Sequence, residues 1–207
     1  MIHLKFTLMR IFASMVLLMF LSLQMVKGQD AAVVQEAWSN DLMQLQQNGM
    51  MVLGSWALGN LAVSGYHMTR TSGVTYSFHQ MNVFWNTVNL GIALGGYFGA
   101  ASLDPSMGSL EVYNEYNNFG KILLFNTGLD VAYVMTGFFL RERSGNVQKH
   151  SKRLKGYGNS LILQGGFLFA FDLVLFLLTE QTLGDLTDSG QLQVAVMPAG
   201  AGVRLVF

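Results

Sequence analysis

Polar side chains recur at helical spacing inside an otherwise apolar part of the chain. His79, Asn82, Asn86 and Asn89 are separated by three, four and three residues, so all four lie on one face of a helix. An amide without a hydrogen-bond partner is costly in hydrocarbon. We therefore expect this face to point toward other helices rather than toward lipid.

Two acidic residues, Asp130 and Asp172, stand in apolar runs that contain no Lys or Arg to pair with them. Each must be protonated, be hydrogen-bonded by Asn or Gln, or hold a cation. Counting residues from the ends of the apolar runs predicts a polar track with three layers and His79 at its inner mouth. The outer layer is Asn126 with Asp172, the middle layer Asn60, Asn89 and Asp130, and the inner layer Asn82, Asn86 and Gln164.

The residues leave two functions for this track open. In one, it relays a proton or an ion, or binds a small polar ligand. In the other, its side chains only hold the helices together, at ~0.6 kcal/mol per interhelical hydrogen bond. A membrane enzyme using Asp130, Asp172 and His79 is a third, less favoured reading, because the chain has no His-Glu-x-x-His motif, nucleophile elbow or phosphate loop. No cofactor is indicated, and the absence of Cys excludes thiolate metal sites.

Four long segments must position these residues: 50–66, 81–103, 122–140 and 161–178. Each can cross the ~30 Å hydrocarbon core as a helix. A soluble helical core would carry Lys and Glu along every helix. A transmembrane β-barrel would show short segments in which apolar and polar residues alternate. The chain has neither pattern. The predicted fold is an all-α membrane protein with a bundle of four transmembrane helices.

Composition agrees with this fold class. Charged residues make up only 12% of the chain, against ~25% in ordinary soluble domains, and 51% of residues are hydrophobic. Twelve basic and twelve acidic residues give a net charge of zero, which disfavours a nucleic-acid partner. The expected partners are the lipid bilayer and either another membrane protein or further copies of the chain.

The segments outside the bundle have their own signals. Residues 1–28 read as a signal peptide, with Lys5 and Arg10 before a short apolar run, although an uncleaved anchor is the alternative. Residues 29–48 predict an external amphipathic helix, either on the membrane surface or packed on the bundle end. The transmembrane domain then covers 49–180, and 181–207 form an external tail with a possible β-hairpin.

The distribution of charge predicts the orientation. The loop at 141–155 carries six basic residues and one acidic residue, so it is expected on the cytoplasmic side. Both termini then lie outside, as expected of a multi-pass protein of a bacterial inner (cytoplasmic) membrane. Lys149, Lys152, Arg153 and Lys155 could contact lipid headgroups, although a topology signal alone explains them. Gly91, Gly95 and Gly99 form a small-residue stripe that predicts close helix packing.

Two runs carry a resemblance to a known family: FHQMNVFWNTVNLGIA at 78–93 and LGSWALGNLA at 53–62. They resemble a family of small four-helix integral membrane proteins of unknown function, found mainly in Bacteroidetes. The resemblance covers about 48–180. It implies a bacterial origin but brings no activity and no ligand.

Overall fold

The computed structural model describes residues 31–188, 193–197 and 200–204. The predicted signal peptide lies outside these residues. Within them, the chain forms four long helices, followed by two short strands. The helices are α2 (Ala31–Met68), α3 (Gly73–Ala101), α4 (Ser109–Gly145) and α5 (Ser151–Asp188). The strands, β1 (Gln193–Met197) and β2 (Gly200–Arg204), pair antiparallel with Val194 opposite Val203, in the region where the sequence predicts a hairpin.

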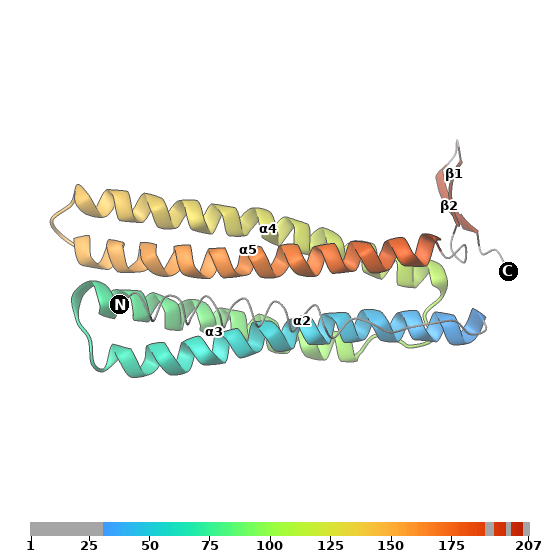
Figure 1. Cartoon of the computed structure of the whole chain (residues 1–207), viewed down its shortest axis with the longest axis horizontal. Coiled ribbons are helices and arrows are strands. Elements are labelled where there is room, and N and C mark those ends of the chain that lie inside the picture. The colour runs from blue at the N-terminus through green and yellow to red at the C-terminus, as the bar shows by residue number, and fades with distance from the viewer. Residues whose placement is uncertain (1–30, 189–192, 198–199, 205–207) are drawn as a thin grey trace. The chain divides into compact units, whose positions relative to one another are not determined.

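The helices run side by side as two helical hairpins, α2 with α3 and α4 with α5 (Figure 1). Helix α5 is the central element, because it packs along α4 and also against α3. The helices are 29 to 38 residues long. At ~1.5 Å per residue they extend well beyond the ~30 Å that a hydrocarbon core requires. The predicted four-helix architecture is confirmed for the described residues.

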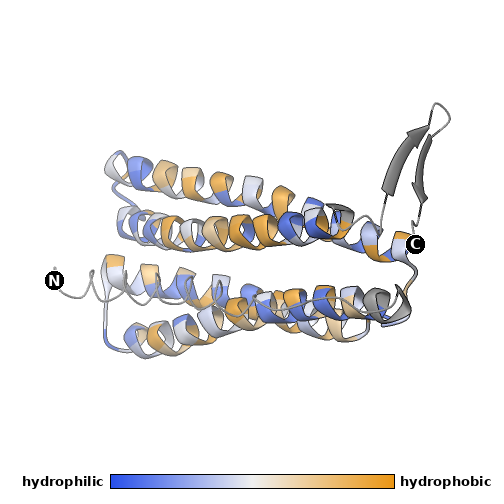
Figure 2. Cartoon of the chain, turned by 45° about the vertical axis from the view of Figure 1, so that its right-hand side comes forward, coloured by the Kyte–Doolittle hydropathy of each residue, from blue (hydrophilic) through white to orange (hydrophobic). Residues whose placement is uncertain are grey.

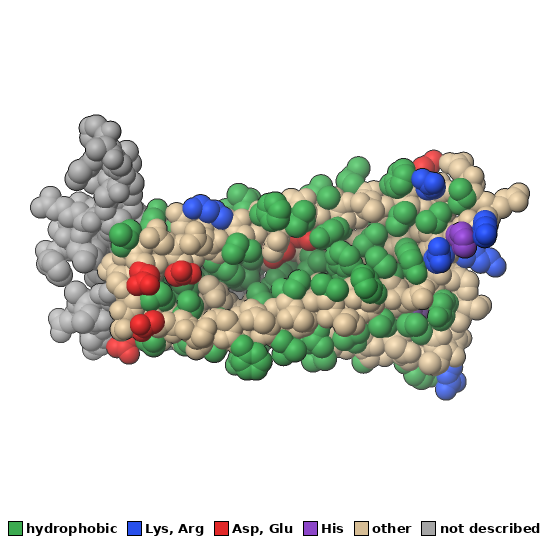
Figure 3. Space-filling model, turned by 180° about the vertical axis from the view of Figure 1, so that it is seen from behind, with side chains coloured by type: hydrophobic (Ala, Val, Ile, Leu, Met, Phe, Trp, Pro, Cys, Tyr) green, Lys and Arg blue, Asp and Glu red, His purple; other side chains and the backbone are tan. Residues whose placement is uncertain are grey.

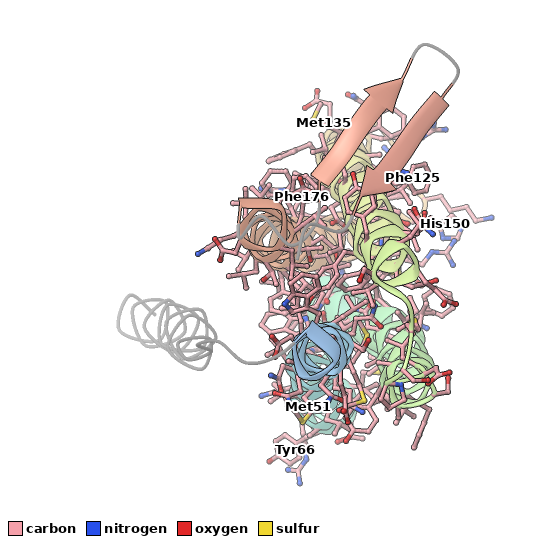
Figure 4. All side chains as sticks on the ribbon, turned by 90° about the vertical axis from the view of Figure 1, so that its right-hand side faces the viewer. Met51, Tyr66, Phe125, Met135, His150 and Phe176 are labelled. Carbon is pink, nitrogen blue, oxygen red and sulfur yellow. The ribbon has the colours of Figure 1, made fainter. Side chains whose placement is uncertain are left out.

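The interior of this bundle holds many polar side chains beside its apolar core. The buried side chains include many polar ones, among them Asn82, Asn86 and Gln164. Large apolar side chains also face outward, with Phe98 66% and Phe125 68% exposed. Apolar residues recur along the whole length of α4 and α5 (Figure 2). In the view along the helices, Met51, Tyr66, Phe125 and Met135 all lie at the periphery (Figure 4).

Among the described residues, two helices are long and apolar enough to cross a membrane. They are α4 and the part of α5 at Ser151–Leu186. The other two helices, α2 and α3, do not reach the same hydropathy, because much of their sequence consists of amide, hydroxyl and glycine residues.

The first helix differs from its predicted boundaries. The sequence predicts a separate amphipathic helix ending at residue 48, whereas α2 continues without a break from Ala31 to Met68. Gly49 lies within the helix, where a Cβ would come within 2.8 Å of a Leu175 methyl group. Leu42 and Leu45 are buried, so this part of α2 contributes to the core.

The glycine stripe on α3 is also placed differently from the prediction. A Cβ added to Gly91, Gly95 or Gly99 would have no atom within 4 Å, so these glycines make no close helix contact in the described structure. A helix turns by ~100° per residue, and this puts the stripe on roughly the opposite side from the amides that face inward. Because the amide face points into the bundle, the glycine face points away from it.

Other glycines bring the helices together. A Cβ on Gly156 of α5 would lie 2.5 Å from the Val74 carbonyl oxygen of α3. A Cβ on Gly158 of α5 would lie equally close, at 2.5 Å, to the Gly137 carbonyl oxygen of α4. These contacts are between backbones, so no side-chain movement could make room for a methyl group.

Candidate functional site in the bundle interior

Asn82 of α3 is the centre of a hydrogen-bond network that joins three helices. Its amide nitrogen donates to Asn60 Oδ1 and to Ser64 Oγ of α2, both at 2.8 Å. Its amide oxygen accepts hydrogen bonds from Gln164 Nε2 and from Ser160 Oγ of α5, the latter at 3.4 Å. We call these five residues the Asn82 hub. Asn82, Ser64, Ser160 and Gln164 are all buried.

The neighbours of the hub fix its orientation. Trp56 Nε1 donates to Gln164 Oε1 at 3.0 Å, so this amide both donates and accepts. The Trp56 ring stacks on Phe167, with centroids 3.9 Å apart. Asn60 Nδ2 donates to the Trp56 carbonyl oxygen at 2.9 Å. The hub is therefore a well-satisfied network, which is the arrangement expected of residues that specify helix packing.

The hub continues to one end of the α2–α3 hairpin through His79. His79 Nδ1 lies 3.1 Å from Ser64 Oγ, the same hydroxyl that accepts from Asn82. The His79 ring stacks on His67, with centroids 5.0 Å apart. Burial lowers the pKa of His79, and the charge of His67 lowers it further. The neutral imidazole, which can accept or donate a proton, is thus favoured at the inner mouth of the predicted track.

A second polar centre is the acidic pair, Asp130 of α4 and Asp172 of α5. Both residues are buried, and their carboxyl groups lie close enough to interact with each other. A hydrogen bond between two carboxyl groups requires a proton on one of them. Gly165 allows this close approach, because a Cβ there would lie 3.0 Å from the Asp130 carbonyl oxygen. Within the described residues, no group of three or more His, Asp or Glu side chains could hold a metal ion.

Four buried polar atoms have no hydrogen-bond partner among the described residues. They are Trp85 Nε1, Asn86 Oδ1, Asn89 Nδ2 and Asp130 Oδ2. Buried polar atoms nearly always have partners in folded proteins. Three of these atoms belong to α3 and one to α4.

The helix register places Asn89 of α3 near the level of Asp130 of α4. The ring of Trp85 on α3 packs edge-on against Tyr133 of α4, with centroids 4.7 Å apart. Both α3 and α4 pack on α5, parallel and antiparallel to it respectively, as their glycine contacts show. They are therefore antiparallel to each other, and Asn89, one turn beyond Trp85, lies level with Asp130.

Comparison with known proteins places the chain in a family. Residues 52–173, more than half of the chain, match a family described as "Family of unknown function (DUF6992)". The chain belongs to the DUF6992 family. Comparisons with curated proteins and with solved structures found no match. The DUF6992 segment includes the whole Asn82 hub and the acidic pair, and it begins within α2 and ends within α5.

The DUF6992 structure brings the predicted site residues together in a different order from the predicted layers. Asn60 bonds to Asn82 in the inner part of the bundle, not to Asn89 in the middle, and Asp172 meets Asp130. Asn126 is half-buried on α4, one turn from Asp130. The predicted layers assume that the four apolar segments begin at the same height along the bundle axis. The helices in fact extend beyond those segments by different lengths, and this shifts the layers.

Sequence reasoning missed several members of the DUF6992 site. Ser64 and Ser160 carry hub bonds, and Trp56, Trp85 and Tyr133 border the polar centres. Small hydroxyl residues are common on helices, so their types alone carry little signal. One signal was available: Ser64 and Asn60 are four residues apart and thus share a helix face.

Proposed function

We propose that this DUF6992 protein is an integral protein of a bacterial inner membrane that binds and exchanges a proton at the acidic pair. In this proposal all four helices cross the membrane, with both termini on the outer side. The pattern of burial supports membrane insertion, because a surface of exposed Phe, Leu and Met side chains around an interior with many polar groups suits lipid better than water.

The charge distribution supports the same orientation. Lys, Arg and His side chains gather at one end of the helices, and most of the visible acidic side chains lie near the other end (Figure 3). The basic end includes the α4–α5 turn with Lys149, Lys152 and Arg153. Excess Lys and Arg in short loops is typical of the cytoplasmic side. The α3–α4 connection at 102–108 then lies outside.

The observation that carries the proton assignment is the contact between Asp130 and Asp172. Two buried carboxyl groups that interact closely repel each other when both are ionised, which favours a proton on one of them, and the surrounding segments offer no Lys or Arg as a counter-charge. A polar path leads toward them from His79 through Ser64 and Asn82. Asn86 extends this path by donating to the Asn82 carbonyl oxygen at 2.8 Å.

A structural role is the second candidate, and the Asn82 hub favours it. Every hub side chain is engaged, and the hub bonds α2 and α3 to α5. Interhelical bonds of this kind stabilise a bundle without any exchange of ligands. The two candidates differ in what the acidic pair does, because the hub would be needed in both.

The proton assignment is tested with Asp130→Asn and Asp172→Asn, and with Asp185→Asn as the control, since Asp185 is an exposed acid on the same helix as Asp172. Each variant is reconstituted in liposomes that contain a pH-sensitive dye. We expect both interior variants to lose the proton flux and the infrared carbonyl band of a protonated carboxyl group. The control should keep both signals.

The outcome separates the two candidates. Loss of both signals at unchanged helix content supports proton exchange. If the wild-type protein shows no protonated carboxyl band and no flux above empty liposomes, the proton assignment is wrong and the structural role stands. A flux that follows Na⁺ rather than pH would also overturn it, in favour of a cation site at the same residues.

A further inference from the structure

A surface hollow of about 450 Å³ lies where α4 ends and α5 begins. It shares no residue with the Asn82 hub and does not include the acidic pair. Its lining combines cationic, hydroxyl and apolar groups, together with one acid. The lining residues are Phe138, Arg141, Glu142, Ser144, Gly145 and Lys155.

The hollow is held in shape by the packing of the two helices. A Cβ on Gly158 of α5 would lie 2.9 Å from Arg141 Cγ, so the stem of Arg141 rests directly on α5. Ser144 is buried and donates to the Arg141 carbonyl oxygen at 2.6 Å. Ser151 of α5 in turn donates to the Ser144 carbonyl oxygen at 2.6 Å. The second of these bonds ties the end of α4 to the start of α5.

The chemistry of the lining selects an anion. Arg141 and Lys155 supply two positive charges against the single negative charge of Glu142. An Arg fork with a nearby Lys suits a phosphate group, because the guanidinium binds two of its oxygens and the ammonium adds a point charge. Lys149 in the nearby turn and Lys152 in the first turn of α5 add further positive charge.

The apolar part of the lining indicates that the phosphate belongs to a molecule with an apolar tail. Phe138 is half exposed at the edge of the hollow, one turn before Arg141. Phe139 and Met135, both more than half exposed, continue this apolar surface along α4. A ligand with an anionic head and an apolar tail would thus contact both parts at once.

We propose that this hollow binds the headgroup of an anionic phospholipid in the cytoplasmic leaflet, with an acyl chain lying along α4. The inference rests on the proposed membrane location but not on the proton assignment. It differs from the sequence prediction, which places headgroup contacts at Lys149, Lys152, Arg153 and Lys155. Of those four, only Lys155 lines the hollow, and Arg141 is its principal anion ligand.

The test compares lipid retention by two double variants. Arg141→Gln with Lys155→Gln removes the hollow's cations, and Arg70→Gln with Lys121→Gln removes two exposed charges elsewhere. Each protein is placed in nanodiscs of phosphatidylcholine with or without phosphatidylglycerol, and co-purified lipid is measured by native mass spectrometry. We expect the hollow variant to retain on the order of tenfold less phosphatidylglycerol. The control should match the wild type.

Two further measurements distinguish a bound phospholipid from a bound free phosphate, and this proposal from the proton assignment. Inorganic phosphate at millimolar concentration should not displace the lipid, and displacement would overturn the proposal in favour of a soluble anion. Equal retention by the hollow variant and the control would also overturn it. Asp130→Asn should retain phosphatidylglycerol like the wild type, so failure of the proton assignment is distinguished from failure of this one.

Discussion

At the scale of single residues, the interior has two parts with different hydrogen bonding. Asn82 uses both atoms of its amide, in four bonds to α2 and α5. Asn86 and Asn89, on the same face, each keep one amide atom without a partner among the described residues. A network that served only to hold helices would be expected to satisfy both parts equally. The contrast supports the proposal that the hub holds the helices together and that the region of the acidic pair is the exchange site.

Replacing Asn82 with Leu should therefore destabilise the bundle. Four interhelical bonds at ~0.6 kcal/mol each predict a loss of roughly 2 kcal/mol in the free energy of unfolding. Thr87→Ala is the control, because Thr87 is exposed on the same helix and bonds only to the Val83 carbonyl oxygen of its own helix. Unfolding is measured in bicelles for both variants. A loss in Asn82→Leu no larger than in the control would show that the hub does not hold the helices.

At the scale of helices, the sequence predicts part of the arrangement because spacing is a local property. The interval of three or four residues between Asn82, Asn86 and Asn89 was enough to place them on one inward face. The same spacing could not show that the face with Gly91, Gly95 and Gly99 points outward, since both faces of the helix have residues suited to packing. Helix ends were also missed. Helix α4 begins at Ser109 and passes through Glu111 and Glu115, because backbone hydrogen bonds form regardless of hydropathy.

The pairing of carboxyl groups was beyond the sequence for a related reason. Asp130 and Asp172 were each recognised as unusual, yet their contact depends on how far α4 slides along α5. That offset is set by Gly137, Gly158 and Gly165, which let the two backbones touch. Small residues of this kind are frequent along all four helices, so their positions do not reveal which ones meet.

The close helix contacts predict opposite effects for two glycine substitutions. Gly156→Ala places a methyl group within 2.5 Å of the Val74 carbonyl oxygen, and overpacking of this kind costs ~1–3 kcal/mol. Gly95→Ala meets open space, and the better helix propensity of Ala should leave stability unchanged or raise it by up to ~1 kcal/mol. Thermal unfolding in detergent distinguishes them. If Gly95→Ala were the more damaging change, the stripe on α3 would have to contact another protein chain.

At the scale of the whole molecule, neutrality conceals a separation of charge. The chain has 12 basic and 12 acidic residues, yet Lys and Arg concentrate at one end of the helices (Figure 3). Acidic residues gather toward the opposite end, and the acidic pair is buried between them. In a membrane this separation fixes orientation, because basic loops are retained in the cytoplasm. The headgroup hollow then faces the leaflet in which anionic lipids attract basic residues.

The orientation can be measured directly because the chain contains no cysteine, so any single cysteine introduced is the only one that reacts. Pro105→Cys places a thiol in the connection between α3 and α4, and Gln148→Cys places one in the turn between α4 and α5. A membrane-impermeant maleimide should label Pro105→Cys in intact cells, and Gln148→Cys only after permeabilisation, with the cysteine-free parent as the blank. Labelling of both from outside would mean that α4 does not cross the membrane. The reverse pattern would place the basic end, the His79 mouth and the headgroup hollow on the outer side, and it would reverse the direction in which a proton reaches the acidic pair.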